Sequence, residues 1–343
     1  MEASSGPAEP LLAGKLPTPL LAEILAGLPA PPADVVLGPR IGEDACAIEV
    51  TGGVLVAATD PITFTAEEIG RFSVIVNAND VAVMGVRPRW FLAVILLPSG
   101  STEAMVRQVF GSMQESLDRV GASLVGGHTE VTPAVTQPVV VGQFLGIAED
   151  GRFVRSGGMR PGDVLIQVGP APIEGAAVLA REAAERLIGL DPAVLGQALE
   201  ALDRPGISVV DPALLAAELG ATAMHDPTEG GLAAGLHELA EACGVRVRVD
   251  LSSVLWFAPG RAVCEALGAD PMSTLASGAL LAAFSPERAE AALQALAGHG
   301  YVASGIGRAL DGSGVDDLDG RPLASPERDE VARLLARESD SRG

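Results

Sequence analysis

Lysine is nearly absent from this sequence: among 343 residues there is one, Lys15. A Walker A loop needs Gly-Lys followed by Ser or Thr, and Lys15 is followed by Leu16, so a P-loop is excluded. A lysine Schiff base to pyridoxal phosphate is disfavoured for the same reason. A chain of this composition that handles phosphates must therefore use metal-bridged carboxylates, backbone amides and arginines.

Aromatic residues and cysteines are also scarce. Aromatics make up 3% of the chain and apolar residues 48%, so a full core can be buried, and it must be aliphatic and rich in alanine. The three cysteines, Cys46, Cys243 and Cys264, are odd in number and far apart. This argues against a disulfide framework and predicts a cytoplasmic protein. No Cys-x-x-Cys pair indicates structural zinc.

Long apolar runs and excess positive charge are missing too. No apolar run reaches about 18 residues, so no membrane span is predicted. The N-terminus lacks a basic region followed by an apolar one, so no signal peptide is predicted. The net charge is −21. Because an acidic surface of this size repels phosphate backbones, we expect no nucleic-acid partner.

The order of strand and helix patterns predicts an α+β fold with two domains. Apolar runs predict strands such as 90–97 and 164–168, and helical spacing predicts helices such as 102–120 and 286–298. The predicted divisions are a leader with a short helix (1–35), an N-terminal domain (36–150), a C-terminal α+β domain (151–325) and a final helix and tail (326–343).

Three acids in the first half occupy three different local settings. Asp44 follows a glycine-containing turn, and Asp60 ends an apolar strand. Asp80 lies inside a helix predicted over 65–86, on the edge of its apolar stripe, with Asn77 three residues back on the same side. A carboxylate near a buried face is costly unless a cation or hydrogen-bond donors satisfy it. Mg²⁺ is a natural partner because it prefers carboxylate and phosphate oxygens.

Local capping residues predict where two helices begin. Thr65 and Glu68 form the pattern of a capping box for the helix that carries Asp80. In the second half, Asp226 or Thr228 can cap a helix over 232–243, and two glycines between cap and helix permit close approach to an anion. A plain cap with glycines used for packing is the alternative interpretation.

A fourth acid lies in the segment Gly-Gly-His-Thr-Glu at 126–130, after a strand predicted at 123–125. Gly126 and Gly127 could let backbone amides approach a phosphate. If the four acids converge, they could hold Mg²⁺ ions against a triphosphate. Spacing alone leaves open that they are caps, turn residues and solvated acids. The four are Asp44, Asp60, Asp80 and Glu130.

Taken together, these segments resemble the superfamily of aminoimidazole ribonucleotide synthetase, and within it the branch of the hydrogenase maturation protein HypE. Residues 79–88 are similar to the family pattern Asn-Asp-x-Ala-x-Met-Gly-x-x-Pro. Residues 226–233 are similar to Asp-Pro-Thr-Arg-Gly-Gly-Leu-Ala, and residues 264–271 also resemble HypE-like chains. Residues 42–45, Gly-Glu-Asp-Ala, resemble a segment of thiamine monophosphate kinase. The resemblance covers roughly residues 36–310.

The resemblance implies an AIR-synthase-like fold whose N-terminal sheet forms a barrel across a homodimer, with ATP near the dimer interface and Mg²⁺ on the acids. The implied metal and ATP ligands are Asp44, Asp60, Asp80 and Glu130. Asn77, Gly126 and Gly127 are implied as further cofactor contacts, with the glycines at the phosphates. Asp226 and Thr228 would line the cleft from the second domain, as catalytic residues together with Asp80.

This chain departs from the HypE pattern at the acceptor side. HypE-like chains end in Pro-Arg-x-Cys, whereas residues 336–343 contain no cysteine, and the HypE segment Asn-Glu-Gly is replaced by Ala-Ser-Gly at 276–278. The resemblance implies transfer of the ATP γ-phosphoryl group to a substrate oxygen, and we expect a small oxygen acceptor here. The alternatives are a non-catalytic HypE-like dimeric scaffold that serves a maturation partner, and an enzyme like thiamine monophosphate kinase, which only residues 42–45 favour.

Overall fold

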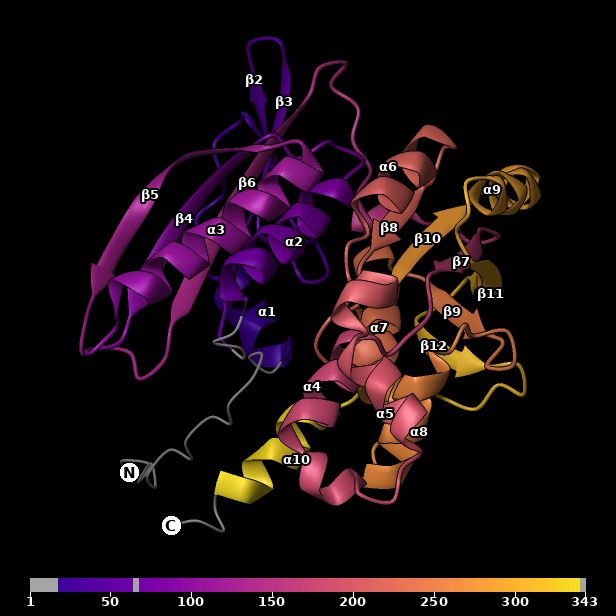
Figure 1. The fold of residues 1–343 in the computed structure, drawn as a ribbon. Helices are drawn as coiled ribbons and strands as arrows, with labels where there is room; N and C mark the ends of the chain where they lie inside the picture. Colours follow the sequence, from indigo (N-terminus) through magenta and orange to yellow (C-terminus); the bar gives the residue numbers. More distant parts are fainter. Residues whose placement is uncertain (1–17, 64–67, 340–343) are drawn as a thin grey trace, which may run out of the picture.

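The structure is a computed structural model that describes residues 18–63 and 68–339. Its framework is two six-stranded sheets, one built from β1 to β6 and the other from β7 to β12. Figure 1 shows the two sheets lying apart from each other, with α2 and α3 over the first. Both sheets mix parallel and antiparallel neighbours. The predicted two-domain α+β fold is thus confirmed.

The first sheet has the strand order β1-β2-β3-β6-β4-β5, and its neighbours are antiparallel except β4 and β5. Its strands are β1 (Val35–Leu37), β2 (Cys46–Val50), β3 (Gly53–Ile62), β4 (Trp90–Leu97), β5 (Ser123–Val131) and β6 (Val139–Ala148). The sequence predicted two strands over 36–60, and the structure has three, because β2 and β3 form a hairpin.

Helices α2 (Ile69–Ala82) and α3 (Glu103–Val120) cover one face of this sheet (Figure 1). Every second residue of β4 is buried: Phe91, Ala93, Ile95 and Leu97. The intervening residues, Leu92 and Val94 among them, are apolar but only half-buried. The other face of the sheet, called here the open face, is therefore apolar along β4.

The two helices begin differently from each other. The α3 start agrees with the sequence: the Thr102 hydroxyl accepts a hydrogen bond from the Met105 N–H at 3.3 Å. Helix α2 begins at Ile69 rather than at residue 65, after Glu68 in a left-handed conformation with φ 54°. The capping-box prediction is wrong for Glu68, whose carboxylate lies 3.3 Å from the Arg71 guanidinium and caps no backbone N–H. Thr65 lies outside the described residues.

The second sheet has the order β12-β9-β11-β7-β10-β8. Its strands are β7 (Val164–Val168), β8 (Ala223–His225), β9 (Arg246–Val249), β10 (Leu280–Phe284), β11 (Ala303–Leu310) and β12 (Gly314–Asp317). The remaining helices are α1 (Thr18–Ala26), α4 (Glu174–Glu182), α5 (Pro192–Leu199), α6 (Val210–Glu218), α7 (Gly231–Cys243), α8 (Ala258–Leu267), α9 (Pro286–Gly298) and α10 (Glu330–Ser339).

One cluster of buried apolar side chains runs through both domains. It joins Val81 of α2 to Val210 and Ala213 at the start of α6, and continues to Phe284 of β10. Through this shared core, helix α2, which carries Asp80, packs against the second domain. Among the described residues, none of the helices is both long and apolar enough to cross a bilayer.

Candidate metal and nucleotide site

Four aspartates from four separate elements influence one another's charge. Asp44 lies in the loop between β1 and β2, Asp60 in β3, Asp80 in α2, and Asp226 directly after β8. Burial, followed by the nearby carboxylates of Asp226, Asp60 and Asp44, raises the pKa of Asp80 well above its usual value. We call Asp44, Asp60, Asp80 and Asp226 the acid cluster.

Asp226 is the member of the acid cluster that fits a cation most directly. Its side chain is 3% exposed, and its Oδ2 atom has no hydrogen-bond partner in the described part of the chain. Burial and the Asp44 carboxylate raise its pKa well above the usual value. A buried carboxylate oxygen with no donor is costly. A hard divalent ion between these oxygens would remove that cost and the mutual repulsion, so the residues present fit Mg²⁺.

His225 is a site residue that the sequence analysis missed. Its Nδ1 lies 2.8 Å from Asp44 Oδ2, and its Nε2 lies 2.9 Å from Glu238 Oε2. Burial acts to lower the pKa of His225, but the Asp44 and Glu238 carboxylates outweigh it and hold this pKa well above its usual value. Ligand atoms of Asp44, His225 and Asp226 lie within 4.8 Å of one another. Because both ring nitrogens already face carboxylates, His225 balances charge and orients Asp44 instead of ligating a metal.

The loop before β7 supplies polar groups around Asp44. Ser156 donates its hydroxyl to Asp44 Oδ2 at 3.2 Å and its backbone N–H to Glu43 at 3.1 Å. Arg155 reaches the buried Glu43 carboxylate at 3.3 Å, while its Nε has no partner among the residues that the structure describes. Neither Arg155 nor Ser156 was predicted as a site residue from the sequence. Arg155 is thus a cation that contacts Glu43, the residue before Asp44 of the acid cluster.

Asn77 holds the backbone of Asp60. Its Oδ1 accepts the Asp60 N–H at 2.7 Å, and its Nδ2 donates to the carbonyls of Asp60 at 3.2 Å and Ser73 at 2.8 Å. A side chain at Gly142, which pairs with Asp60 in the sheet, would collide with the Asn77 amide. The Asn77 amide is thus committed to positioning Asp60. Its predicted contact with a cofactor stays a prediction.

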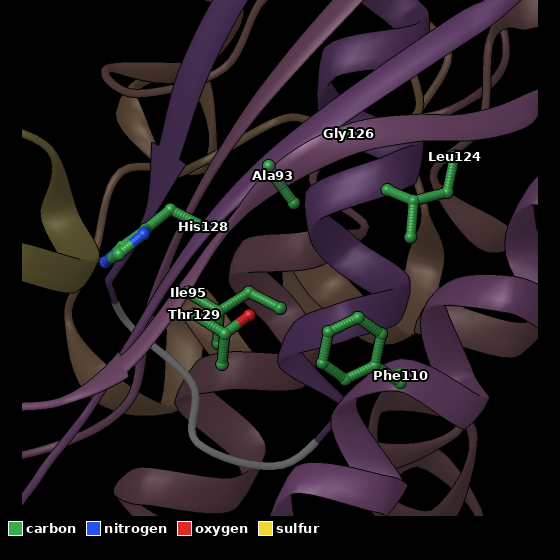
Figure 2. A pocket seen from close by; sticks show the side chains of 8 residues that line it. Ala93, Ile95, Phe110, Leu124, Gly126, His128 and Thr129 are labelled. Atoms are coloured by element: carbon green, nitrogen blue, oxygen red, sulfur yellow. The ribbon is translucent and has the colours of Figure 1, made fainter.

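The segment 126–130 is not a turn after a strand, because it lies inside β5. A β-bulge at Val125 shifts the register against β4, so that Leu124 pairs with Phe91 and Gly126 with Leu92. In Figure 2, Leu124 and Thr129 lie on the same side of the strands as Phe110, whereas His128 points to the opposite side. Together with Ala93 and Ile95 these residues line a cavity of about 180 Å³.

Gly127 is required by strand packing. Its φ is 148°, and a Cβ there would collide with the backbone carbonyl of Ala93. A Cβ at Gly126, in contrast, would make only an ordinary van der Waals contact with the Leu92 side chain. The close approach of β5 to β4 therefore explains why residue 127 is a glycine. The predicted contact of Gly126 and Gly127 with phosphates stays a prediction.

Glu130 does not join the acid cluster within one chain. Its side chain is 48% exposed and lies 3.3 Å from His128 Nε2. Strand β5 is separated from β3, which carries Asp60, by β4 and β6, a span of roughly 14 Å at the usual strand spacing. Glu130 also pairs with Leu96 of the open face, whereas Asp60 follows the buried Val56 and Ala58. The expected convergence of all four predicted acids therefore fails in a single protomer.

The start of α7 is not capped by Asp226 or Thr228. The helix begins at Gly231 after Gly230 in a left-handed conformation with φ 80° and no side-chain cap of its own. The Gly230 N–H instead donates to Asp329 Oδ2 at 2.7 Å. Thr228 contributes its carbonyl, which accepts from the N–H groups of Gly231 at 3.0 Å and Ala276 at 3.1 Å. The local capping prediction is thus wrong, because the cap comes from a distant segment.

Comparison with known proteins agrees with this architecture. Two family models match the chain: AIR synthase related protein, N-terminal domain, over residues 42–148, and AIR synthase related protein, C-terminal domain, over residues 160–317. The chain belongs to the AIR synthase-related family. The carbamoyl dehydratase HypE of Rhizobium leguminosarum bv. viciae is 32% identical over 274 residues, which are 76% of this chain and 74% of that protein. The protein is therefore a HypE-like member of the family.

Two solved structures show the same fold. The crystal structure of the hydrogenase maturation protein HypE in complex with ATP matches with a TM-score of 0.68 at 25% identity, and the match covers 86% of this chain and 92% of that one. AaThiL complexed with AMPPCP and TMP matches with a TM-score of 0.70 at 20% identity, covering 91% and 94%. At that lower identity the second match shows the fold alone.

Proposed function

We propose that this protein binds ATP with Mg²⁺ at the acid cluster and transfers the γ-phosphoryl group to a small oxygen acceptor. The observation that carries the proposal is the pair of buried carboxylates of Asp80 and Asp226, brought together from the two domains with one Asp226 oxygen unpartnered. The similarity to an ATP-bound HypE structure supports the choice of nucleotide.

Each residue of the site has a task in this proposal. Asp44, Asp80 and Asp226 would hold Mg²⁺, which when bound supplies the charge neutralisation that a P-loop lysine supplies elsewhere. Asp60, fixed by Asn77, would complete the oxygen ligands. His225 keeps one oxygen of Asp44 oriented through its 2.8 Å contact. Arg155 would contact a phosphate oxygen, because its guanidinium lies 3.3 Å from Glu43, the residue before Asp44.

Two of the three cysteines, Cys243 and Cys264, are poor candidates for a thiol acceptor, which favours an oxygen acceptor over either of these thiols. Cys264 is fully buried, and burial raises the pKa of its thiol to about 11. Burial also raises the pKa of the Cys243 thiol to about 11, and this thiol donates to the Ser156 carbonyl. A thiol acts as a nucleophile through its thiolate, which both environments disfavour.

We further propose that the active form is a homodimer joined through the open face of the first sheet. That face carries half-buried apolar side chains such as Leu92 and Val94. The edge strand β5 leaves Val125, the residue of the bulge, 54% exposed. Exposed apolar surface beside a free strand edge favours association. In such a dimer, Glu130, which lies on the open face, would lie at the interface, and its contact with Mg²⁺ and ATP stays a prediction.

The test is nucleotide binding and turnover by the intact protein and matched variants. We expect the parent to bind AMPPCP only with Mg²⁺ and to hydrolyse or transfer from ATP, and Asp80→Asn and Asp226→Asn to lose both. The exposed Asp311→Asn is the control for a lost negative charge. Equal turnover in the parent and Asp80→Asn would refute the metal assignment. Tight binding without turnover would favour the scaffold interpretation, and phosphorylation of thiamine monophosphate the kinase interpretation.

A further inference from the structure

Asn79, the residue before Asp80 in α2, makes two hydrogen bonds to the second domain. Its side chain is 1% exposed. Its Nδ2 donates to the carbonyl of Ile207 at 2.9 Å, and its Oδ1 accepts the N–H of Val209 at 2.9 Å. Ile207 and Val209 belong to the connection that leads into α6. The amide therefore bridges the two domains with both of its ends.

These two hydrogen bonds satisfy backbone groups that are buried away from water. Ile207 and Val209 are each 1% exposed. A buried donor or acceptor that loses its partner carries the full cost of desolvation. An amide that donates at one end and accepts at the other fits this pair of backbone groups in one orientation only. The contact thus fixes both the distance and the rotation of this turn of α2 relative to the second domain.

A second contact fastens the same helix to the same region, but far from the acids. Arg71, at the start of α2, donates to the Leu202 carbonyl at 2.8 Å and to Asp203 at 2.6 Å. It precedes Asp80 by nine residues, about 13 Å along a helix. Arg71 and Asn79 therefore form a matched pair of interdomain contacts, one distant from the acid cluster and one beside it.

We propose that Asn79 is a positioning residue that sets the Asp80 carboxylate of the first domain against the Asp226 carboxylate of the second. The inference rests on the proposed metal site, since it assigns Asn79 a task in building that site. Ligand geometry must be held within about 0.5 Å by supporting contacts. Asp80 and Asp226 come from different domains, so no single element can hold both, and the Asn79 bridge is the contact adjacent to Asp80 that spans them.

The experiment compares Asn79→Ala with Arg71→Met in the full chain, using Mn²⁺ alone as the probe. Loss of outer-shell support weakens metal affinity by about 10- to 100-fold, which we expect for Asn79→Ala. We expect Arg71→Met to lower the unfolding temperature while changing Mn²⁺ affinity less than about twofold, because it acts on the remote end of α2. A crystal structure of each variant gives the second measurement, the separation of the Asp80 and Asp226 carboxylates, which only Asn79→Ala should change.

The outcomes separate this inference from the function that it rests on. If the parent binds no Mn²⁺, the metal proposal fails, and the carboxylate separation in the two crystal structures alone decides the role of Asn79. If Arg71→Met weakens Mn²⁺ as much as Asn79→Ala, or if Asn79→Ala changes neither affinity nor separation, the inference is overturned. Should Asn79→Ala not fold, Asn79→Ser takes its place, and failure of both to fold would make Asn79 a stabilising residue only.

Discussion

Replacing Glu174 by glutamine should flatten the dependence of stability on pH. Glu174 is the first residue of α4, and its carboxylate accepts a hydrogen bond from Ser277, in the segment that departs from the HypE pattern. Burial raises its pKa to about 7, the Ser277 hydrogen bond partly offsets this, and the carboxylates of Asp329 and Glu229 add to the rise. Ionising this side chain in the folded protein is therefore unfavourable.

The size of the effect follows from the shift. A rise of the pKa from 4.5 to about 7 corresponds to about 3 kcal/mol of folding free energy. Between these values the folded chain retains a proton that the unfolded chain has lost, so stability falls as pH rises through this window. Below pH 4.5 the ionisation cost is absent, and above about pH 7 it is fully present. Glutamine carries no charge and can still accept from Ser277.

The assay is urea unfolding at pH 5 and pH 8 for the parent and Glu174→Gln, in buffer without divalent metal. Asp80 and Asp226 titrate in both proteins, so the difference between the two isolates Glu174. We expect the stability of the variant to exceed that of the parent by up to about 3 kcal/mol at pH 8 and by much less at pH 5. Glu182→Gln, at the exposed end of the same helix, is the control. A parent and variant that differ equally at both pH values would refute the reasoning.

Three further outcomes follow from the same structure. Asp226→Asn should raise the melting temperature in metal-free buffer, because it removes a buried like charge, and it should abolish stabilisation by Mg²⁺. A lower melting temperature of this variant in metal-free buffer would contradict the repulsion among the buried carboxylates. Val94→Arg on the open face should give a monomer in sedimentation, whereas Gln114→Arg on exposed α3 should leave the dimer intact, and a dimer in both would reject that face. Cys264 should resist a thiol reagent at pH 8 until denaturant is added, and rapid labelling of the folded protein would contradict its burial.

Elements with a strong local signal could be predicted from the sequence. The strands Trp90–Leu97 and Val164–Val168 have the predicted bounds, because each is an apolar run closed by turn residues. The helix Pro286–Gly298 also begins and ends where its proline and glycine indicate. Elements that depend on a distant partner could not be predicted. β12 is a short polar segment that becomes a strand by pairing with β9, and the α7 N-terminus is capped by Asp329.

The residues of the candidate site fall into the same two groups, those with a local sequence signal and those placed only by distant contacts. Asp44, Asp60 and Asp80 could be identified because each lies in an unusual local setting, and the structure does bring them together. Asp226, expected in the cleft as a catalytic residue, proves to belong to the same group of carboxylates. His225 and Arg155 could not be identified, since a single histidine or arginine carries no pattern. Only the tertiary fold places His225 beside Asp44 and Arg155 beside Glu43.

The β-bulge at Val125 decides to which side β5 directs its polar side chains. Successive strand residues alternate between faces, and the bulge takes Val125 out of that alternation. If Val125 instead paired regularly with Leu92, His128 and Glu130 would turn inward beneath α3, and Gly127 and Thr129 would turn outward. The bulge thus governs whether the carboxylate on this edge is available to a neighbouring molecule or is sequestered in an aliphatic interior that could not solvate it.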